Sequence, residues 1–386
     1  MISSKRKVLL ISVMDAWGGG EEYILNLTKS IPENDYYIVS HQNEVYKRFQ
    51  DEGLNVISVN SLKKFYKKAN KWNFNIAVKT LFNIILTTYK IFPLIFHNKI
   101  NLIIANGNYA GLYALPVALL TRRYLLVVQH LVYEKGSTEQ RFIKLIYHYS
   151  NKFIAVSNSV KENILMLTNS TDTDKISVIY NGIYFPTSYQ IKNTEQIDIG
   201  IIGSLIRAKG IIHIIEAGKE LLLAKHNKIH LQIYGNTRED DSIKYFETLK
   251  DYILKCGISS KVHFNDFLRN KNILYNSIDI LVQFSLVPES FSYSVLEAMS
   301  YGKIVISADA GGPKEFIKNN CNGFLIPLGD KLALAEKLKY CANNLHSEQF
   351  YLIRNEARKT VEEYYSIDKF ADKYRSLFDS TFGKMD

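Results

Sequence analysis

Short apolar runs alternate with amphipathic segments along almost all of this 386-residue chain, and this alternation restricts the folds open to it. Short runs that are apolar throughout are typical of strands buried on both faces of a parallel sheet. Helix-like segments between them, such as 22–31 and 159–167, are typical of βα units. The pattern therefore predicts an α/β fold with doubly wound parallel sheets.

The alternation runs through the chain twice. The first half contains seven candidate strands: Val8–Val13, Tyr36–Ser40, Asn55–Val59, Leu102–Ala105, Tyr124–Val128, Phe153–Val156 and Ser177–Tyr180. A polar segment without periodicity, 186–196, looks like a linker. The second half contains six more candidates: Ile197–Ile202, Ile229–Tyr234, Val262–Phe264, Ile278–Gln283, Ile304–Ser307 and Phe324–Ile326.

We therefore expect two Rossmann-like domains, 1–190 and 191–365, that face each other across a cleft. The tail from residue 347 has a helical pattern, and we expect the last helix, 366–386, to pack back on the N-terminal domain. In open sheets of this type, ligands bind beyond the carboxyl ends of the strands. Functional residues should therefore lie in loops that directly follow strands.

Composition and patterning exclude several classes of protein. Hydrophobic residues make up 47% of the chain and charged residues 22%, which excludes wholesale disorder. Three cysteines lie far apart without C-x-x-C spacing, which argues against a disulfide framework or zinc ribbon and favours a reducing compartment. The first apolar run is too short for a signal peptide. Lys79, Lys90 and Pro93 interrupt the segment 76–96, so we expect a helix packed in the domain or lying partly on a bilayer.

The net charge of +10 is concentrated in the first domain. Residues 1–190 contain 22 Lys and Arg against 13 Asp and Glu, whereas 191–386 contain 26 against 25. No acidic residue occurs from Gly53 to Tyr133, and Lys64, Lys67, Lys68 and Lys71 would share one helix face. Such a run can be a solvated face, but anionic lipid also attracts it. We expect residues 60–123 to meet an anionic membrane surface, and we expect no nucleic-acid partner because no such motif is present.

In each half of the chain, a glycine-containing loop follows the first strand. Gly18, Gly19 and Gly20 precede a helix whose N–H groups could bind an anion, although without a dinucleotide fingerprint a flexible turn is also possible. The loop 203–210 contains Arg207 and Lys209. Both cations could neutralise a diphosphate, or they could be solvated loop residues.

The segment Pro288–Met299 follows an apolar strand and contains two carboxylates eight residues apart, Glu289 and Glu297. Carboxylates accept hydrogen bonds from sugar and ribose hydroxyls. A helix starting near Ser292 would place Glu297 on its second turn and offer N–H groups to phosphate or sugar oxygens.

Two weaker candidates lie in the first half. His130 follows the fifth strand, where a histidine is often only a polar loop residue. Asp172-Thr173-Asp174 matches a D-x-D metal motif but lies in a polar loop before a strand, so we expect no metal site there.

The spacing from Glu289 to Glu297, followed by Ala298-Met299, resembles the nucleotide-sugar signature of retaining glycosyltransferases of family 4, which have the GT-B fold. Other segments occur in the family's order: Gly-Gly-x-Glu near the start, Asn181-Gly182, Gly-Ser-Leu-x-x-x-Lys-Gly at 203–210, and Gly-Gly-Pro-Lys-Glu at 311–315. The set covers most of the chain and is specific for the family, but not for the sugar.

The resemblance implies roles for individual residues. Glu289 would hold hydroxyls of the donor sugar, Glu297 would accept from the ribose hydroxyls, and Lys209 would bind the diphosphate. The backbone of Phe291, Ser292 and Tyr293 would contact the sugar and distal phosphate, Gly18–Gly20 would face the phosphates, and His130 would lie near the reacting sugar. Ser204 and Arg207 are also expected to bind the donor. Family members often have Arg where this chain has Ser204, and whether Arg207 replaces that missing Arg is left open.

We therefore expect a retaining, metal-independent hexosyltransferase. It would move a sugar from a UDP- or GDP-sugar to a glycan or lipid-linked acceptor in bacterial cell-surface polysaccharide synthesis, without a cofactor. We expect it in the cytoplasm, peripherally associated with the inner face of the plasma membrane. A GT-B-like epimerase or phosphorylase, or a non-catalytic nucleotide-sugar-binding protein, remains as an alternative.

Overall fold

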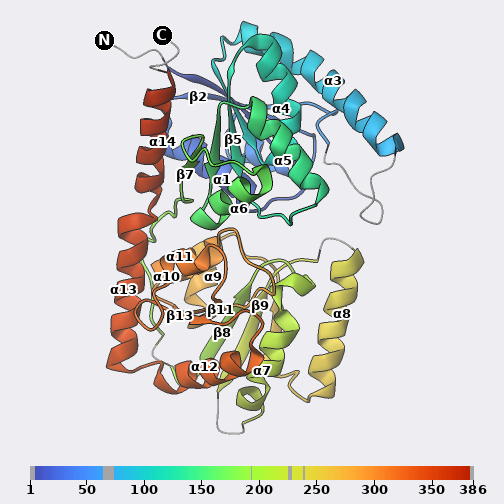
Figure 1. The fold of residues 1–386 in the computed structure, drawn as a ribbon. Coiled ribbons are helices and arrows are strands. Elements are labelled where there is room, and N and C mark those ends of the chain that lie inside the picture. Colours follow the sequence, from blue (N-terminus) through green and yellow to red (C-terminus); the bar gives the residue numbers. More distant parts are fainter. Residues whose placement is uncertain (1–4, 64–73, 193, 225–227, 238–239, 383–386) are drawn as a thin grey trace. The chain divides into compact units, whose positions relative to one another are not determined.

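The chain folds into two compact units (Figure 1). The computed structural model describes residues 5–63, 74–192, 194–224, 228–237 and 240–382. Unit 1 comprises Met1–Gly182 and Phe370–Asp386, and unit 2 comprises Ile183–Lys369. Each unit is an α/β structure built on one parallel sheet, which confirms the predicted fold class.

Unit 1 contains a seven-stranded parallel sheet in the order β3-β2-β1-β4-β5-β6-β7. Its strands are β1 (Lys7–Ile11), β2 (Asp35–Ser40), β3 (Val56–Ser58), β4 (Leu102–Asn106), β5 (Tyr124–Gln129), β6 (Lys152–Ala155) and β7 (Ile176–Val178). The connecting helices are α1 (Gly19–Ser30), α2 (Glu44–Asp51), α3 (Phe74–His97), α4 (Asn108–Thr121), α5 (Thr138–Tyr149) and α6 (Asn158–Thr168). The strand order reverses between β1 and β4, which is where ligands bind in doubly wound sheets.

Unit 2 contains a six-stranded parallel sheet in the order β10-β9-β8-β11-β12-β13. Its strands are β8 (Ile197–Ile202), β9 (Ile229–Tyr234), β10 (Val262–Asn265), β11 (Ile280–Gln283), β12 (Ile304–Ala308) and β13 (Phe324–Ile326). Its helices are the short 3-10 turn η2 (Arg207–Lys209), α7 (Ile211–Leu223), α8 (Asp240–Lys255), α9 (Lys271–Asn276), α10 (Tyr293–Ser300), α11 (Pro313–Phe316), α12 (Lys331–Asn344) and α13 (Glu348–Tyr364). The corresponding switch point lies between β8 and β11.

Helix N-termini in both units are fixed by local sequence. In the described part of the chain, a backbone N–H of the first turn donates to the side-chain oxygen of the N-cap residue at six helices. These N-cap residues are Asn43, Ser137, Ser157, Asn270, Asp330 and Ser347. Such caps satisfy donors that the helix itself leaves open. These local signals explain why the helices start where the amphipathic pattern begins.

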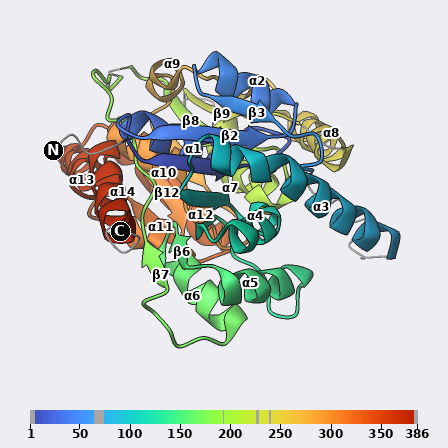
Figure 2. The same cartoon turned by 90° about the horizontal axis from the view of Figure 1, so that it is seen from above.

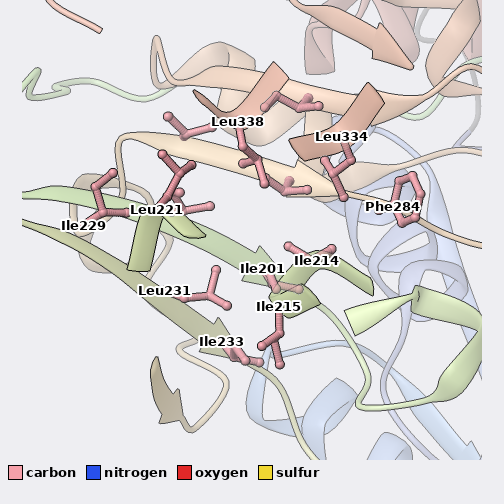
Figure 3. Packing of buried hydrophobic residues seen from close by; sticks show 14 of the residues in the cluster. Ile201, Ile214, Ile215, Leu221, Ile229, Leu231, Ile233, Phe284, Leu334 and Leu338 are labelled. Carbon is pink, nitrogen blue, oxygen red and sulfur yellow. The ribbon is translucent and has the colours of Figure 1, made fainter. Parts of the chain in front are cut away.

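The apolar runs of the sequence form the cores of the sheets. In unit 2, Ile201, Leu231 and Ile233 point from the strands toward Ile215 of α7, and Leu334 and Leu338 of α12 belong to the same cluster (Figure 3). All of these side chains are buried. Burying one such side chain contributes roughly 1.5–3 kcal/mol, so the alternating pattern carries most of the favourable free energy.

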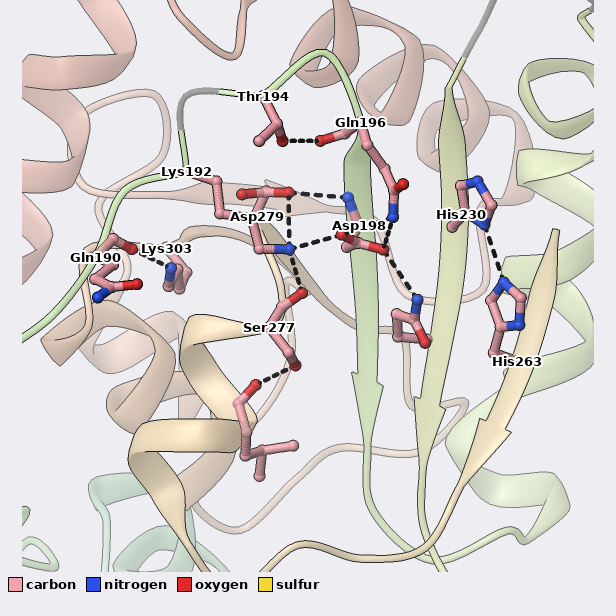
Figure 4. Close-up of polar contacts among 12 residues, drawn as sticks. Gln190, Lys192, Thr194, Gln196, Asp198, His230, His263, Ser277, Asp279 and Lys303 are labelled. Atoms are coloured by element: carbon pink, nitrogen blue, oxygen red, sulfur yellow. Dashed lines mark hydrogen bonds and ion pairs between the residues drawn. The ribbon is translucent and has the colours of Figure 1, made fainter.

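A buried polar cluster holds the amino ends of the strands in unit 2 together (Figure 4). Lys192 Nζ lies 2.6 Å from Asp198 Oδ2, and the backbone N–H of Asp198 donates to Asp279 Oδ2 at 2.9 Å. Gln232 Nε2 also donates to Asp198, at 2.9 Å. The segment 186–196 is therefore more than a linker, because Lys192 ties it to β8.

The last helix, α14 (Ile367–Phe382), starts in unit 2 and enters unit 1 at Phe370. Within unit 1, the ring of Phe370 lies 5.3 Å from that of Tyr23, centroid to centroid, and the hydroxyls of Tyr23 and Tyr374 share a hydrogen bond. Arg375 Nε lies 2.8 Å from Glu33 Oε1. These contacts attach the C-terminal helix to α1 and the segment that follows it.

Candidate active site

The loop after β8 is locked to the loop after β11, at the switch point of unit 2. The N–H of Leu286 donates to the carbonyl of Ala208 at 2.7 Å. Gly210 has a φ of 62°, and a Cβ there would lie 2.2 Å from the carbonyl oxygen of Phe284. Only glycine fits this position, because other residues avoid such a backbone and the space is already filled. The close approach brings the side chains of the two loops together.

Lys209 and Glu289 form an ion pair where these loops meet. Lys209 Nζ lies 2.5 Å from Glu289 Oε1, and Ser285 Oγ donates to the same oxygen. Side-chain exposure is 32% for Lys209 and 20% for Glu289, so the pair is open to a ligand. A pocket beside it is lined by Gly203, Ser204, Lys209 and Ser285, among others. Of the predicted site residues, Ser204 and Lys209 therefore line one pocket, and Glu289 is paired with Lys209 beside it.

Two glycines hold the backbone of Glu289. The N–H of Gly312 donates to the carbonyl of Glu289 at 2.7 Å. Gly311 has a φ of 68°, and a Cβ there would come within 1.9 Å of the same oxygen. The glycine pair is thus needed because one backbone segment packs directly on another. It fixes the position from which the Glu289 carboxylate extends.

Helix α10 starts directly after this loop, with Ser292 at its N-cap position. The Ser292 side chain does not cap the helix, and its Oγ lies 3.2 Å from Ser294 Oγ instead. Phe291 is buried, with its ring centroid 5.7 Å from that of Phe316. The anchored Phe291 fixes the entry to the helix, where backbone N–H groups suit an anion.

Glu297 is held from helix α9. Tyr275 donates its hydroxyl to Glu297 Oε2 at 2.6 Å, and Lys271 Nζ lies 2.6 Å from Oε1. Glu297 is buried, whereas the Lys271 side chain is 40% exposed. The carboxylate is thus oriented on both oxygens, with one partner that can move away.

Arg207 points in another direction. Its guanidinium lies over the ring of Tyr245 in α8, 5.2 Å from the ring centroid. The Tyr245 hydroxyl accepts from the N–H of Ile212 at 3.0 Å, so the aromatic platform is itself fixed. Lys209 is therefore the cation of this loop that contacts Glu289, and donor binding by Arg207 stays a prediction.

In unit 1, Asn106 links Gly20 to His130 at the carboxyl ends of β4 and β5. Asn106 Nδ2 donates to the carbonyl of Gly20 at 3.0 Å, and Asn106 Oδ1 lies 2.6 Å from His130 Nε2. A carbonyl can only accept, so the amide nitrogen must face Gly20 and the amide oxygen must face the histidine. His130 Nε2 therefore carries the proton.

The surroundings of His130 keep it neutral. Burial lowers the pKa of His130 to about 4. The ring of Tyr23 packs edge-on against it, with centroids 4.9 Å apart. With Nε2–H bound to Asn106, the neutral ring presents Nδ1 as an acceptor.

The glycines before α1 differ in their constraints. Gly18 has an extended backbone with φ of −152°, which any residue can adopt. At Gly20, a Cβ would lie 3.3 Å from Asn106 Nδ2 and 3.8 Å from His130 Cδ2. Space beside the asparagine and histidine, rather than backbone conformation, therefore favours glycine at residue 20; Gly19 starts α1.

The D-x-D segment forms a local turn. Asp172 Oδ1 accepts from the N–H of Asp174 at 3.0 Å and from that of Lys175 at 3.2 Å. Within the described part of the chain, no three His, Cys, Asp or Glu side chains gather as a metal site would require.

Four site residues were missed in the sequence: Asn106, Ser285, Lys271 and Tyr275. Asn106 ends a strand and Ser285 closely follows one, so the rule that selected His130 could have found both. Lys271 and Tyr275 lie on a short helix without a motif, and only their contacts with Glu297 reveal them.

Two family models match adjacent parts of the chain. "Glycosyltransferase Family 4" matches residues 17–184, and "Glycosyl transferases group 1" matches residues 189–360. Together they cover every strand except β1 and every loop described above.

Individual proteins agree with this match. An uncharacterized glycosyltransferase of Methanocaldococcus jannaschii is 30% identical over 59% of this chain and 60% of its own length. The capsular polysaccharide biosynthesis glycosyltransferase CapM of Staphylococcus aureus is 24% identical over 93% of this chain and 96% of its own. The structure of Anabaena HepE in complex with UDP and glucose superposes with a TM-score of 0.82 at 18% identity, covering 97% of this chain and all of HepE. The chain thus belongs to the family 4 glycosyltransferases with the GT-B fold.

Proposed function

We propose that this protein transfers a sugar from a nucleotide diphospho-sugar, with UDP or GDP as the nucleotide, to a glycan or lipid-linked acceptor. The observation that carries this proposal is the open pair of Lys209 and Glu289 at the switch point of unit 2. A cation and a hydroxyl acceptor side by side match the two ends of such a donor, its diphosphate and its sugar. HepE, which has the same fold, is known in complex with UDP and glucose.

In the proposed reaction, the bond between the anomeric carbon and the diphosphate oxygen breaks while the acceptor oxygen bonds to that carbon. The acceptor hydroxyl attacks from the face that the diphosphate leaves, which retains the anomeric configuration. Its proton passes to the departing phosphate oxygen. No protein nucleophile is required, so the residues act by binding and by stabilising charge.

Lys209 would stabilise the negative charge that develops on the diphosphate. When the donor binds, Lys209 exchanges the Glu289 carboxylate for phosphate oxygens, and the N–H groups at the start of α10 add further donors. We propose that these charges suffice without a divalent metal. Glu289, released from Lys209 but still held by Ser285, then accepts from the sugar hydroxyls.

Glu297 would accept from the ribose hydroxyls. Its second oxygen stays fixed by Tyr275 while the exposed Lys271 gives way. On the acceptor side, Nδ1 of the neutral His130 would accept a hydrogen bond from a substrate hydroxyl, since Nε2 is already bound to Asn106.

The biological role would be the synthesis of a cell-surface polysaccharide. CapM, which aligns along nearly the whole chain, is a capsular polysaccharide biosynthesis enzyme. We place the activity in the cytoplasm, where nucleotide sugars are made, at the inner face of the plasma membrane.

Turnover of a panel of UDP- and GDP-sugars, with and without EDTA, tests the proposal. Lipid extracts and oligosaccharides serve as acceptors, and proton NMR of the product gives its anomeric configuration. We expect a glycosylated product with retained configuration, made equally well in EDTA. Inverted configuration overturns retention, and loss in EDTA overturns metal independence.

The alternatives give other products. An epimerase yields an epimerised sugar without an acceptor, and a phosphorylase yields a sugar phosphate when inorganic phosphate is added. Tight binding of a donor without any turnover would identify a non-catalytic protein. Each of these results contradicts the proposed transfer.

A further inference from the structure

Helix α3 exposes an apolar stripe along one side of unit 1. The residues of this stripe recur every three or four positions, which places them on one face of a helix. They are Phe74, Val78, Leu81, Ile85, Tyr89 and Phe92. Exposure reaches 82% at Phe74 and 60% at Ile85. Soluble proteins rarely expose large contiguous apolar patches to water.

A different face of the same helix attaches it to the domain. Thr87, Ile91 and Ile95 are buried, and α3 packs beside α4 (Figures 1 and 2). The hydroxyls of Ser61 and Thr87 share a hydrogen bond of 2.7 Å. The exposed stripe therefore does not hold α3 on unit 1, and the fold leaves it available.

Among the described residues, α3 is the one helix long and apolar enough to cross a membrane: it has 24 residues, and an 18-residue window within it has a mean hydropathy of 1.3. The position of α3 in the fold argues against a membrane-spanning helix. The helix connects β3 to β4, both of which belong to one parallel sheet, so both of its ends return to the same layer. A helix in this position can lie on a bilayer surface with its apolar face immersed.

The charged residues on α3 and in the sequence around it are all cationic. Lys79 and Lys90 are exposed on α3, Lys99 follows the helix, and Arg122 is the C-cap residue of α4. No acidic residue occurs between Gly53 and Tyr133. Long cationic side chains can lie along an apolar surface while their charged ends reach the headgroups of anionic lipids. The lysines Lys64, Lys67, Lys68 and Lys71 of the predicted basic face lie outside the described residues.

We propose that the stripe on α3 is a docking surface for an anionic lipid bilayer. The charges favour lipid over a second copy of the chain. In a symmetric dimer the same patch faces itself, so Lys79 and Lys90 of both copies would be brought together without an acidic partner from this region. A bilayer with anionic headgroups satisfies the apolar face and the cations at once. The proposal goes beyond the transfer reaction and does not depend on it.

Vesicle flotation of the full chain tests the proposal without any sugar donor. One set of vesicles contains phosphatidylcholine alone, and the other contains equal parts of phosphatidylcholine and phosphatidylglycerol. We expect strong binding only to the anionic vesicles, weakened by salt because part of the attraction is electrostatic.

Helix α8 in unit 2 offers matched controls. Lys244 and Lys255 are exposed on it with the same eleven-residue spacing as Lys79 and Lys90, and Ile243 and Leu254 are exposed apolar residues. The double variant Lys79→Gln with Lys90→Gln should lose roughly 25-fold in binding to anionic vesicles, since each cation near the surface contributes about fivefold.

Leu81→Glu with Ile85→Glu should lose more than about tenfold, because the immersed apolar area disappears and two anions are added. The corresponding changes on α8, Lys244→Gln with Lys255→Gln and Ile243→Glu with Leu254→Glu, should leave vesicle binding unchanged. An unchanged melting temperature shows that the α3 variants remain folded.

Several results would overturn the proposal. These are absence of vesicle binding by the unmodified chain, equal binding to both vesicle types, and equal losses in the α3 and α8 variants. A dimer in light scattering that Leu81→Glu dissociates, without vesicle binding, would assign the stripe to a second copy instead.

Discussion

The two edges of the sheet in unit 2 both carry paired charges, but they use them differently. At the amino edge, Asp198 is buried and held by Lys192, Gln196 and Gln232. At the carboxyl edge, Glu289 is partly exposed and pairs with one charged group of the described residues, Lys209. A buried carboxylate with several hydrogen-bond partners holds the fold together, whereas a partly exposed carboxylate with one charged partner can exchange that partner for a ligand.

The pKa shifts of the amino-edge carboxylates are consistent with this structural role. Burial alone would raise the pKa of Asp198, but hydrogen bonds from Lys192, Gln232 and Gln196 outweigh it and lower the pKa. Burial raises the pKa of Asp279, only partly opposed by the N–H of Asp198 and the charge of Lys192. These two carboxylates are therefore coupled to their protein partners in the folded state, which suits a structural role.

Glu289→Gln provides the largest expected effect. Transfer should fall by about 10²–10³-fold, because a preorganised charged group at the reacting sugar is lost. Binding of the nucleoside diphosphate should be equal or tighter, since Lys209 no longer has an anionic partner. Steady-state kinetics and calorimetry measure the two quantities, and Glu336→Gln on α12 is the control. Normal turnover would contradict the role given to Glu289.

Asp198→Ala tests the opposite edge. Removing one partner of a buried charge cluster should cost about 3 kcal/mol of unfolding free energy, because Lys192 is left without its closest carboxylate. The turnover of folded molecules should stay within about twofold, as residues outside a site rarely alter its chemistry. Urea denaturation gives the stability, with the exposed Asp251→Ala as the control. A large loss of nucleotide affinity in Asp198→Ala would remove the contrast between the two edges.

Lys209→Met should weaken binding of UDP or GDP by roughly 30-fold, which corresponds to about 2 kcal/mol for a charged hydrogen bond. Calorimetry measures the affinity. Arg207→Met is the informative companion, because the Arg207 guanidinium lies on Tyr245. An equal loss of affinity in Arg207→Met would identify Arg207 as a second phosphate ligand. Unchanged affinity in Lys209→Met would exclude Lys209 as a phosphate ligand.

The unfolding free energy should also depend on pH through Lys303, which lies at the amino edge. Burial lowers the pKa of Lys303 to about 8, below the ordinary value of 10.5. Between these two values the unfolded chain binds more protons than the folded one, so the contribution of this group to stability rises with pH. From pH 8 to 10 the gain is about 2 kcal/mol.

The comparison with Lys303→Met isolates that contribution from other titrating groups. The difference in unfolding free energy between the original chain and the variant should rise with pH over this interval. A difference that is flat or falls with pH would show that the Lys303 ammonium is not desolvated in the fold.

Tyr275→Phe should have the smallest effect. It removes one hydrogen bond to Glu297 and should cost about 1 kcal/mol, or roughly fivefold, in nucleoside diphosphate affinity. Tyr301→Phe is a matched control, because the Tyr301 ring stacks on Tyr275 but its hydroxyl binds Asn272. Equal effects of both changes would indicate general loosening of the stack rather than an oriented carboxylate.

Much of the fold could be predicted because strands buried on both faces have continuous apolar sequences. All thirteen strands occur in the predicted order, and the bounds of β8, β9 and β13 agree fully. Strand ends are set by backbone pairing, so the predicted strand Ile278–Gln283 starts two residues later in the structure, after Asp279 turns to the amino-edge cluster.

The sequence by itself determined which loops follow strands and which of them carry carboxylates and cations, since both are local properties of the chain. Tertiary structure decided the partners: Lys209 with Glu289, Lys271 and Tyr275 with Glu297, Asn106 with His130, and Arg207 with Tyr245. These pairs join segments brought together only when the crossover connections order the strands. Tertiary structure also decided which face of α3 is exposed, because the buried face of an apolar helix is set by the neighbours that pack against it.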